Sequence, residues 1–256
     1  MKILVSILKY PPDFTGAGLR TKQMYHNLLD RGAVDQVYVI TSREHAAPKN
    51  RAELGHQEIR YVGFNPYAES QITRLSKLKK ANFVLKAGIR TIIQYFKLFR
   101  NIDIVHTIDS SWLSTVVGWC AFFTGKPLIK EIVLLGADDP LSIMRHKQFA
   151  LQHIFLLPFK YANLVVAISA GLQKACLTYG LSEEKIWCRH NPIYVVQTEE
   201  NSAYQQSLPG VDFSRPLILN VGRISPRKNT RFLLEAAFYL QGKAQLLFVG
   251  PSDDIE

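Results

Sequence analysis

The sequence is poor in cysteine and lacks a long apolar run. Its three cysteines are odd in number and form no Cys-x-x-Cys pair, a pattern that fits a reducing compartment better than a disulfide framework. Its seven histidines show no spacing typical of metal ligands, so we expect no metal site. No stretch reaches the roughly 18 apolar residues of a membrane-spanning helix, because Lys126, Lys130 and Glu131 interrupt the best candidate.

The amino terminus also lacks the features of a signal peptide. Residues 3–8 form an apolar core of only six residues, and no small-residue cleavage site follows it. The apolar region of a signal peptide needs about 7–15 residues. We therefore interpret this segment as the first β-strand, and we expect a cytoplasmic protein that is soluble or peripheral on the cytoplasmic membrane face.

Short apolar runs alternate with longer segments of helical period along the 256 residues. This alternation predicts an α/β fold with parallel sheets and crossover helices. The predicted strands are residues 3–8, 37–41, 59–64, 102–106, 128–134, 164–169, 186–190, 217–221 and 245–249.

A polar stretch without clear periodicity divides the chain. It contains turn-forming residues such as Pro209 and Gly210, and we interpret it as an interdomain linker. The prediction is a Rossmann-like amino-terminal domain over residues 1–196, a linker over 197–215, and the start of a second Rossmann-like domain over 216–256. That last part holds only a strand, a helix and a strand, which is a small part of an ordinary domain.

The net charge of +10 is concentrated in one segment. Residues 71–100 contain eight cations and no carboxylate, while apolar residues recur there at steps of three and four. The pattern predicts one basic amphipathic helix, or two in succession. Such a helix either packs its apolar stripe on the sheet as a crossover helix or lies on an anionic membrane. The cations expected to face a membrane are Lys77, Lys79, Lys80, Lys86 and Arg90.

Nucleic acid is not an expected partner of this basic segment. No helix-turn-helix, zinc-finger or RNP pattern accompanies the cations, and surface aromatic residues are not interleaved with them. These patterns are typical of proteins that bind nucleic acid.

Two loops have the composition of phosphate-binding segments. Gly16 and Gly18 follow the first strand and precede a helical segment, where their bare N–H groups can face a phosphate. An ordinary glycine loop is the alternative, and the third glycine of a dinucleotide fingerprint is missing. Near the end of the chain, Gly222, Arg223 and Lys228 follow a strand, at the edge where open α/β sheets bind ligands. A solvated pair of cations is the alternative there.

Several short segments, in their order along the chain, resemble those of a known family. They are the double-proline loop with Gly16 and Gly18, Asp103-Ile104-Val105-His106, residues 163–169, Tyr179-Gly180-Leu181, Asn191-Pro192, and Val221-Gly222-Arg223 with Lys228. Over nearly its whole length, the chain resembles the retaining glycosyltransferases of the GT-B fold, family four.

The resemblance implies two Rossmann-like domains and a UDP- or GDP-sugar donor, with no cofactor. The first domain would hold the acceptor, a glycolipid or a polysaccharide, and the second would hold the nucleotide. By motif match, Gly16 and Gly18 would lie near the donor phosphates, while Arg223 and Lys228 would contact the diphosphate. Fixed cations at this place would stabilise the negative charge that develops on the leaving oxygen.

The resemblance also implies residues on the acceptor side of the cleft, among them His106 and Asn191. Where many relatives have a histidine after the fifth predicted strand, this sequence has Asp138. A carboxylate there could orient an acceptor hydroxyl or accept its proton, or it could cap the helix that follows Pro140. Asn229 replaces the usual glycine after the lysine, and Asn accepts left-handed backbone conformations.

One departure from the family concerns two glutamates that relatives carry eight positions apart after this lysine. Here the later glutamates are Glu235 and Glu256, which do not form that pair. We therefore expect a truncated glycosyltransferase, inactive as these 256 residues alone. The hypothesis is transfer with retention to a lipid-linked or polysaccharide acceptor. Its alternatives are a non-catalytic module that docks on membranes or partners, and a Rossmann oxidoreductase.

Overall fold

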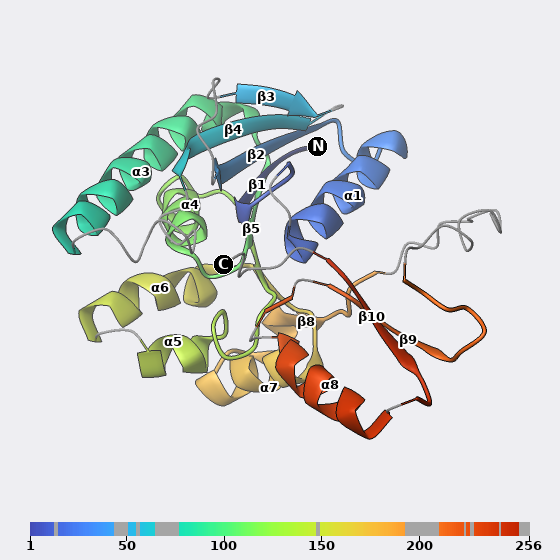
Figure 1. Ribbon diagram of the computed structural model, residues 1–256. Coiled ribbons are helices and arrows are strands. Elements are labelled where there is room, and N and C mark those ends of the chain that lie inside the picture. The colour runs from blue at the N-terminus through green and yellow to red at the C-terminus, as the bar shows by residue number, and fades with distance from the viewer. Residues whose placement is uncertain are drawn as a thin grey trace. The chain divides into compact units, whose positions relative to one another are not determined.

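The chain forms two compact units, Met1–Ile193 and Tyr194–Glu256 (Figure 1). The computed structural model describes residues 1–12, 15–43, 51–54, 57–64, 77–146, 149–192, 210–222, 224–225, 228–240 and 242–250. The predicted linker, residues 197–215, lies mostly outside the described residues.

An eight-stranded sheet forms the centre of the first unit. The strand order is β3-β4-β2-β1-β5-β6-β7-β8, and neighbouring strands are parallel except for the antiparallel pair of β3 and β4. The chain winds outward from β1 first in one direction and then in the other, which is the topology of a doubly wound sheet. The strands are β1 (Lys2–Lys9), β2 (Gln36–Arg43), β3 (Arg51–Leu54), β4 (Gln57–Phe64), β5 (Ile104–Ile108), β6 (Leu128–Ile132), β7 (Leu164–Ala167) and β8 (Ile186–Cys188).

All nine predicted strands are present, seven in this sheet and two in the second unit. Strand β3 was not predicted, because its sequence Arg-Ala-Glu-Leu has no apolar run and it pairs only with β4 at the sheet edge. Strand β5 begins two residues later than predicted. Asp103 precedes it in a bend, where its N–H donates to Lys2 O at 2.8 Å and its carboxylate accepts from Lys2 N at 2.7 Å.

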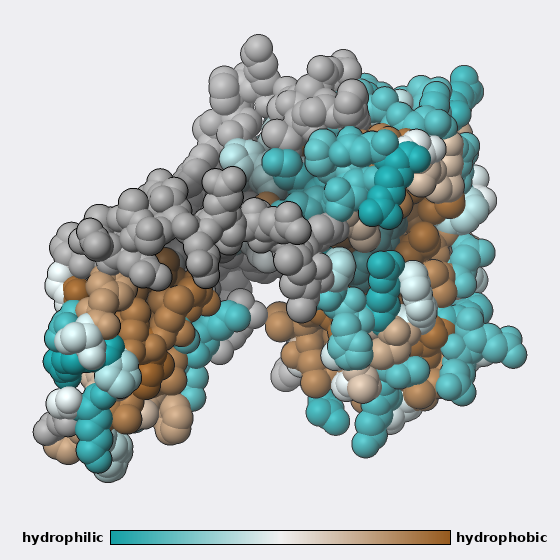
Figure 2. All heavy atoms as spheres, turned by 90° about the vertical axis from the view of Figure 1, so that its right-hand side faces the viewer, coloured by the Kyte–Doolittle hydropathy of each residue, from teal (hydrophilic) through white to brown (hydrophobic). Residues whose placement is uncertain are grey.

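Helices cover both faces of this sheet. Helix α1 (Gly16–Asp30) packs on one face, whereas α3, α4 and α6 lie side by side on the other (Figure 1). The side of the molecule from which α1 is seen carries many hydrophilic side chains (Figure 2). The helices of the second face are α3 (Lys77–Leu98), α4 (Trp112–Phe123), α5 (Pro140–His146), α6 (Phe149–Tyr161) and α7 (Ala170–Tyr179), with the short 3-10 helices η1 (Phe99–Asn101) and η2 (Glu183–Lys185).

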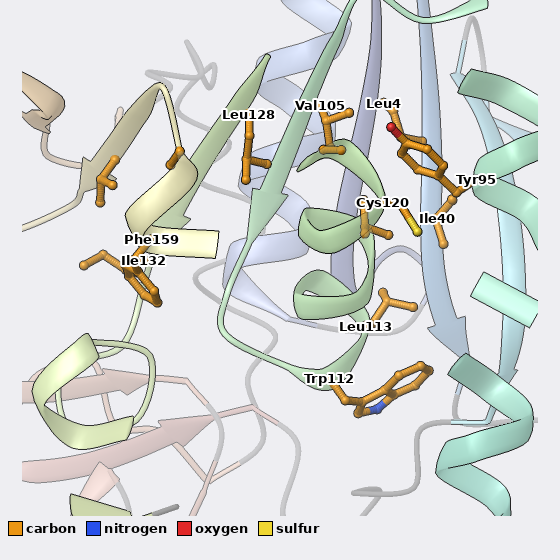
Figure 3. Close-up of a cluster of buried hydrophobic side chains, with 14 of the residues drawn as sticks. Leu4, Ile40, Tyr95, Val105, Trp112, Leu113, Cys120, Leu128, Ile132 and Phe159 are labelled. Carbon is orange, nitrogen blue, oxygen red and sulfur yellow. The ribbon is translucent and has the colours of Figure 1, made fainter. Parts of the chain in front are cut away.

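The two faces have separate apolar cores, because successive side chains of a strand point to opposite faces. In β1, Ile3 and Val5 pack under α1, while Leu4 packs under the other helices. The larger core is shown in Figure 3, where side chains from the sheet meet those of α3, α4 and α6. Its labelled members are Leu4, Ile40, Tyr95, Val105, Trp112, Leu113, Cys120, Leu128, Ile132 and Phe159.

Helix α3 turns a different face to the sheet from the one that its apolar stripe predicts. Of the expected stripe, the side chains of Leu85, Ile89, Ile92 and Phe96 are exposed, Leu85 by 63%. The buried side chains are instead Ala87, Thr91, Tyr95 and Leu98. Ala87 and Thr91 are small and permit close packing, and the Tyr95 hydroxyl lies 2.5 Å from Thr124 Oγ1 at the end of α4. Helix α3 is therefore a crossover helix between β4 and β5, but it packs on the sheet through other residues than its apolar stripe.

The second unit contains one parallel β-α-β arrangement. It consists of β9 (Leu217–Val221), α8 (Thr230–Ala237), the 3-10 helix η5 (Phe238–Leu240) and β10 (Gln245–Val249). Leu219 and Val221 of β9 and Phe232 and Leu234 of α8 are exposed. Among the helices that the structure describes, none is both long and apolar enough to cross a membrane.

A pair of glycine substitutions tests the packing of α1 on the sheet. A Cβ atom at Gly18 would lie 2.6 Å from Lys9 O, whereas a Cβ atom at Gly88 in α3 would meet nothing within 4 Å. Gly18→Ala should therefore lower the free energy of unfolding by about 1–3 kcal/mol, while Gly88→Ala should raise it by about 0.5–1 kcal/mol through helix propensity. Urea unfolding measures the free energy of unfolding of both variants. Equal changes would contradict the close approach of α1 to the β1 backbone at Gly18.

Candidate functional site at the carboxyl edge of the sheet

The start of α1 lies directly after the carboxyl end of β1. Gly18 lets the helix approach the β1 backbone, because a side chain there would meet Lys9 O. Thr15 precedes the helix in an extended conformation and makes no side-chain capping bond, and the first turn contains no acidic residue. Among the described residues, the first-turn N–H groups thus have no side-chain acceptor, and the positive end of the helix dipole can receive an anion. Gly16 is exposed at this end.

Beneath α1, polar side chains form a continuous chain from the helix to the end of the sheet. The Tyr25 hydroxyl lies 2.6 Å from His106 Nδ1 of β5. His106 Nε2 lies 3.3 Å from Glu131 Oε2 of β6, and Glu131 Oε1 forms an ion pair with the Arg20 guanidinium. Arg20 Nη1 also donates to Asn191 Oδ1 at 2.7 Å. Two residues expected from separate motifs, His106 and Asn191, are therefore connected through Arg20 and Glu131.

The charges in this chain are largely shielded from water. The side chains of Arg20 and Glu131 are 12% and 4% exposed. Burial raises the pKa of Glu131, but hydrogen bonds and charge from His106 and Arg20 outweigh it and hold the pKa below its usual value. The pKa of Tyr25 is also raised, first by burial and then by the negative charge of the nearby Glu131 carboxylate. This hydroxyl therefore keeps its proton. Such a paired, nearly buried network fixes side-chain positions and is costly to break.

On the other side of the strand ends, a second polar cluster surrounds Asp109. This residue follows β5 and has a left-handed conformation with φ of 71°, which is uncommon for a residue other than glycine. Its carboxylate accepts from Leu8 N and from Ser111 N, both at 2.9 Å. Its carbonyl oxygen accepts from the Lys130 ammonium. Asp109 thus ties the ends of β1, β5 and β6 together.

Lys130 is the most deeply buried cation of the cluster, with 1% of its side chain exposed. Its ammonium lies 5.2 Å from the centre of the Phe159 ring, within the range of a cation–π contact. Burial lowers the pKa of Lys130 to about 8, against the opposing attraction of Asp109 and Asp138. The ammonium remains charged at neutral pH and compensates the negative charge of the carboxylates near it.

Asp138 belongs to this cluster and does not cap the following helix. Asp138 Oδ1 accepts from Ser110 N at 3.1 Å, whereas Asp139 accepts from Ser142 N at 2.9 Å and so caps α5. The capping alternative expected for Asp138 therefore applies to its neighbour. Burial, and then repulsion by Asp109, raises the pKa of Asp138 to about 6. A carboxyl with this pKa can exchange a proton near neutral pH.

In the second unit, two residues between β9 and α8 have positive φ angles. Gly222 has φ of 152° and Asn229 has φ of 52°, so the asparagine takes the left-handed conformation. Lys228 is exposed, and its N–H donates to Ser225 O at 3.0 Å. Arg223 lies outside the described residues.

The remaining expected site residues belong to α3. Lys77, Lys79 and Lys80 lie in its first turn, where only the backbone is described, and Lys86 and Arg90 are exposed. Within the described ranges, no group of three or more His, Cys, Asp or Glu side chains could hold a metal ion.

Sequence reasoning missed Arg20, Asp109, Lys130 and Glu131. A signal for two of them was present, because Lys130 and Glu131 are adjacent charges inside an otherwise apolar strand. One of two neighbouring residues in a parallel strand points to each face, so both charges need buried partners. Arg20 and Asp109 are such partners, and their contact with β6 depends on the topology.

Comparison with known proteins identifies the fold. No protein-family model matches the sequence, and no curated protein matches it. The structure is similar to that of sucrose-phosphate synthase from Thermosynechococcus elongatus, with 18% identity, a TM-score of 0.69, and coverage of 100% of this chain and 63% of that one. It is also similar to Anabaena HepE in complex with UDP and glucose, with 19% identity, a TM-score of 0.62, and coverage of 98% and 61%.

A third similar structure is a UDP-N-acetylglucosamine 2-epimerase, with 12% identity, a TM-score of 0.53, and coverage of 98% of this chain and 62% of that one. The chain thus spans about three fifths of the length of these proteins. The α/β fold with its parallel sheet is of the GT-B type, as the sequence predicts. Because the same fold occurs in glycosyltransferases and in an epimerase, fold alone does not define the reaction.

The buried ion pair of Glu131 gives a stability test. Glu131→Gln leaves the Arg20 charge without its carboxylate and should lower the free energy of unfolding by about 3 kcal/mol. Asp30→Asn is the matched control, because Asp30 pairs with His26 on the surface of α1, with about half of each side chain exposed. Loss of that pair should cost less than about 0.5 kcal/mol. If urea unfolding showed equal losses of free energy of unfolding for the two variants, the Glu131 network would contribute no more to stability than a surface ion pair.

Adjacent aspartates give a pH test with opposite signs. The folded pKa of Asp138, about 6, exceeds the unfolded value of about 3.9, so its stabilising contribution is lost as pH rises through 6. The stability of Asp138→Asn relative to wild type should therefore increase by about 2 kcal/mol from pH 4 to pH 7. Burial raises the pKa of Asp139, but hydrogen bonds from Ser142 and Gly136 outweigh this effect and lower the pKa. Its stabilising contribution is lost as pH falls below the unfolded value of about 3.9, so Asp139→Asn should lose stability relative to wild type as pH rises from about 2 to 5.

Unfolding curves at several pH values measure both aspartate variants against wild type. Parallel pH profiles for the two variants would contradict the assignment of Asp138 to the buried cluster and of Asp139 to the helix cap.

Proposed function

We propose that the protein is a retaining glycosyltransferase, which transfers a sugar from a UDP- or GDP-sugar to a lipid-linked or polysaccharide acceptor. The observation that carries the proposal is the open first turn of α1 at the carboxyl edge of a GT-B-type sheet, next to a network that holds it in place. Open α/β sheets bind ligands outside the carboxyl ends of their strands. Anabaena HepE, which has this fold, forms a complex with UDP and glucose.

The donor would be held by its phosphates. The N–H groups near Gly16 and Gly18 would face the donor phosphates at the positive end of α1. Arg223 and Lys228, in the loop after β9, would contact the diphosphate of the donor. Cleavage of the bond between sugar and phosphate places negative charge on the leaving oxygen, and fixed N–H groups and cations stabilise that charge more in the transition state than in the ground state.

Asp138 would act on the acceptor. Its carboxyl is held by Ser110 N, and its pKa of about 6 leaves it mostly ionised at neutral pH. An ionised carboxylate at this strand edge can orient an acceptor hydroxyl and receive its proton. His106 and Asn191 would support the acceptor side through Arg20 and Glu131, which hold α1 against β5 and β6.

The proposed location is the cytoplasmic face of a membrane, with α3 against anionic lipid. Its exposed cations include Lys86 and Arg90, and the helix contains no carboxylate. Each cation near an anionic surface contributes about 1 kcal/mol of attraction. Such binding weakens with salt, because exposed charges are screened over about 8 Å at physiological ionic strength.

Substitution of the α3 cations tests this location. Lys86→Gln with Arg90→Gln should weaken cosedimentation with anionic vesicles about thirtyfold, whereas neutral vesicles should bind poorly in every case. Arg31→Gln with Lys174→Gln is the matched control, because it removes two exposed cations outside α3. Equal losses for the two pairs would contradict a role specific to α3.

Donor binding is the test of the proposed activity. Saturation-transfer NMR detects weak binding, and we expect UDP- or GDP-sugars to bind with dissociation constants above about 1 mM, because water screens the attraction between phosphates and an exposed cation such as Lys228. Arg223→Ala and Lys228→Ala should reduce the signal, and Lys243→Ala, an exposed cation of the same unit, should not. Binding of the free sugar as strongly as its nucleotide form would contradict the proposal.

The same experiment separates the competing functions. A nicotinamide cofactor that binds in place of nucleotide sugars would favour an oxidoreductase. Conversion of the bound sugar nucleotide at its C2 carbon would favour an epimerase, the activity named for one protein of the same fold. Absence of all nucleotide binding, with vesicle binding retained, would favour a non-catalytic docking module.

A further inference from the structure

The helices on the second face of the sheet contain no acidic residue. The sequences of α3, α4, α5 and α6 include no Asp and no Glu. The carboxylates between residues 77 and 161 lie instead in the strands and their connections. The outer surface of this helical layer is thus cationic or uncharged. That composition suits an anionic partner and opposes a cationic one.

Aromatic side chains gather where α3, α4 and α6 end. We name them the aromatic belt; its members are Phe96, Phe99, Trp119, Phe122, Phe123 and Tyr161. Phe123 is 72% exposed, and Phe96, Phe122 and Tyr161 are exposed by 41–48%. Apolar surface on this scale is unusual for side chains that contact one another on a free surface.

Direct ring contacts form two groups within the belt, one that joins α4 to α6 and one at the end of α3. The rings of Trp119 and Phe123 stack with centroids 5.6 Å apart. Phe122 of α4 lies 4.2 Å from Tyr161 of α6, measured between ring centroids. On the α3 side, the centroids of Phe96 and Phe99 are 5.5 Å apart. The hydrogen bond between Tyr95 and Thr124 joins the ends of α3 and α4 beside these rings.

Cations flank the belt. Lys97, Arg100 and Lys160 are exposed next to its members in sequence, and the Arg100 guanidinium lies 5.7 Å from the centre of the Phe99 ring. The belt is at the amino-terminal edge of the sheet, because α3, α4 and α6 each run back to the start of the next strand. The candidate site is at the opposite edge, so contact through the belt leaves that site open.

We propose that the aromatic belt inserts into the headgroup region of an anionic bilayer. Trp and Tyr, which join an apolar ring to a polar group, favour this region, and so do Phe side chains that are flanked by Lys and Arg. The proposal rests on the proposed membrane location and adds a hydrophobic component to it. Attraction by the α3 cations alone would hold the protein above the lipid, whereas insertion of the belt fixes which surface faces it.

Tryptophan fluorescence tests insertion without altering the belt. The chain has three tryptophans: Trp112 is buried, Trp187 is on β8, and Trp119 belongs to the belt. In a Trp187→Phe protein, anionic vesicles with lipids brominated near the headgroup should quench Trp119 by at least about half, because bromine quenches only at contact range. Vesicle binding without quenching would overturn the proposal, since it would show that the belt stays outside the bilayer.

Substitution of two phenylalanines of the belt gives the second test. Phe122→Ser with Phe123→Ser should weaken partitioning into anionic vesicles at least about tenfold, because two aromatic side chains would no longer leave water. Phe213→Ser is the matched control, because Phe213 is 49% exposed but lies in the second unit. Thermal unfolding verifies that each variant is folded, and unchanged partitioning of the folded double variant would overturn the proposal.

Failure of this proposal is distinguishable from failure of the proposed function. If the belt binds a protein and not lipid, quenching is absent while nucleotide-sugar binding in NMR persists. If the protein is not a glycosyltransferase, nucleotide-sugar binding is absent while quenching of Trp119 persists. The belt variants leave the carboxyl edge of the sheet unchanged, so they should bind the donor as wild type does.

Discussion

The structure depends on how strand β6 accommodates two adjacent charges. Lys130 and Glu131 point to opposite faces of a buried sheet, where an unpaired charge would cost several kcal/mol. Glu131 pairs with Arg20 and His106, and Lys130 bonds to the Asp109 carbonyl. The first pairing holds α1 on the sheet, and the second fixes the ends of β1 and β5. The buried ion pairs and hydrogen bonds of Lys130 and Glu131 thus set the geometry of the carboxyl edge.

This edge brings together an open helix end and a carboxyl group whose pKa is raised. The first turn of α1 offers N–H groups, and Gly18 allows the helix to approach the end of β1. Nearby, Asp138 has a pKa near neutrality because burial and Asp109 oppose its ionisation. Rigid positioning of these groups before a ligand arrives is the arrangement that catalysis by electrostatic stabilisation requires.

The sequence predicted the elements of the fold better than the contacts of the site. Apolar runs located nine strands, but β3 carries no such run and was missed. The left-handed conformation expected at Asn229 is present. Periodicity identified α3 but not its buried face, because Tyr95 and small residues decide how it packs. The Arg20–Glu131 pair joins residues 111 positions apart, and only the strand order brings them together.

The central claim is that the carboxyl edge binds the phosphates of a sugar nucleotide. Backbone amide NMR during titration with UDP-glucose or GDP-mannose tests it most directly. We expect chemical-shift changes at the amides of residues 16–18, and none at Gly125, which lies at the amino-terminal edge. Changes confined to other residues, or no change at saturating ligand, would contradict the account.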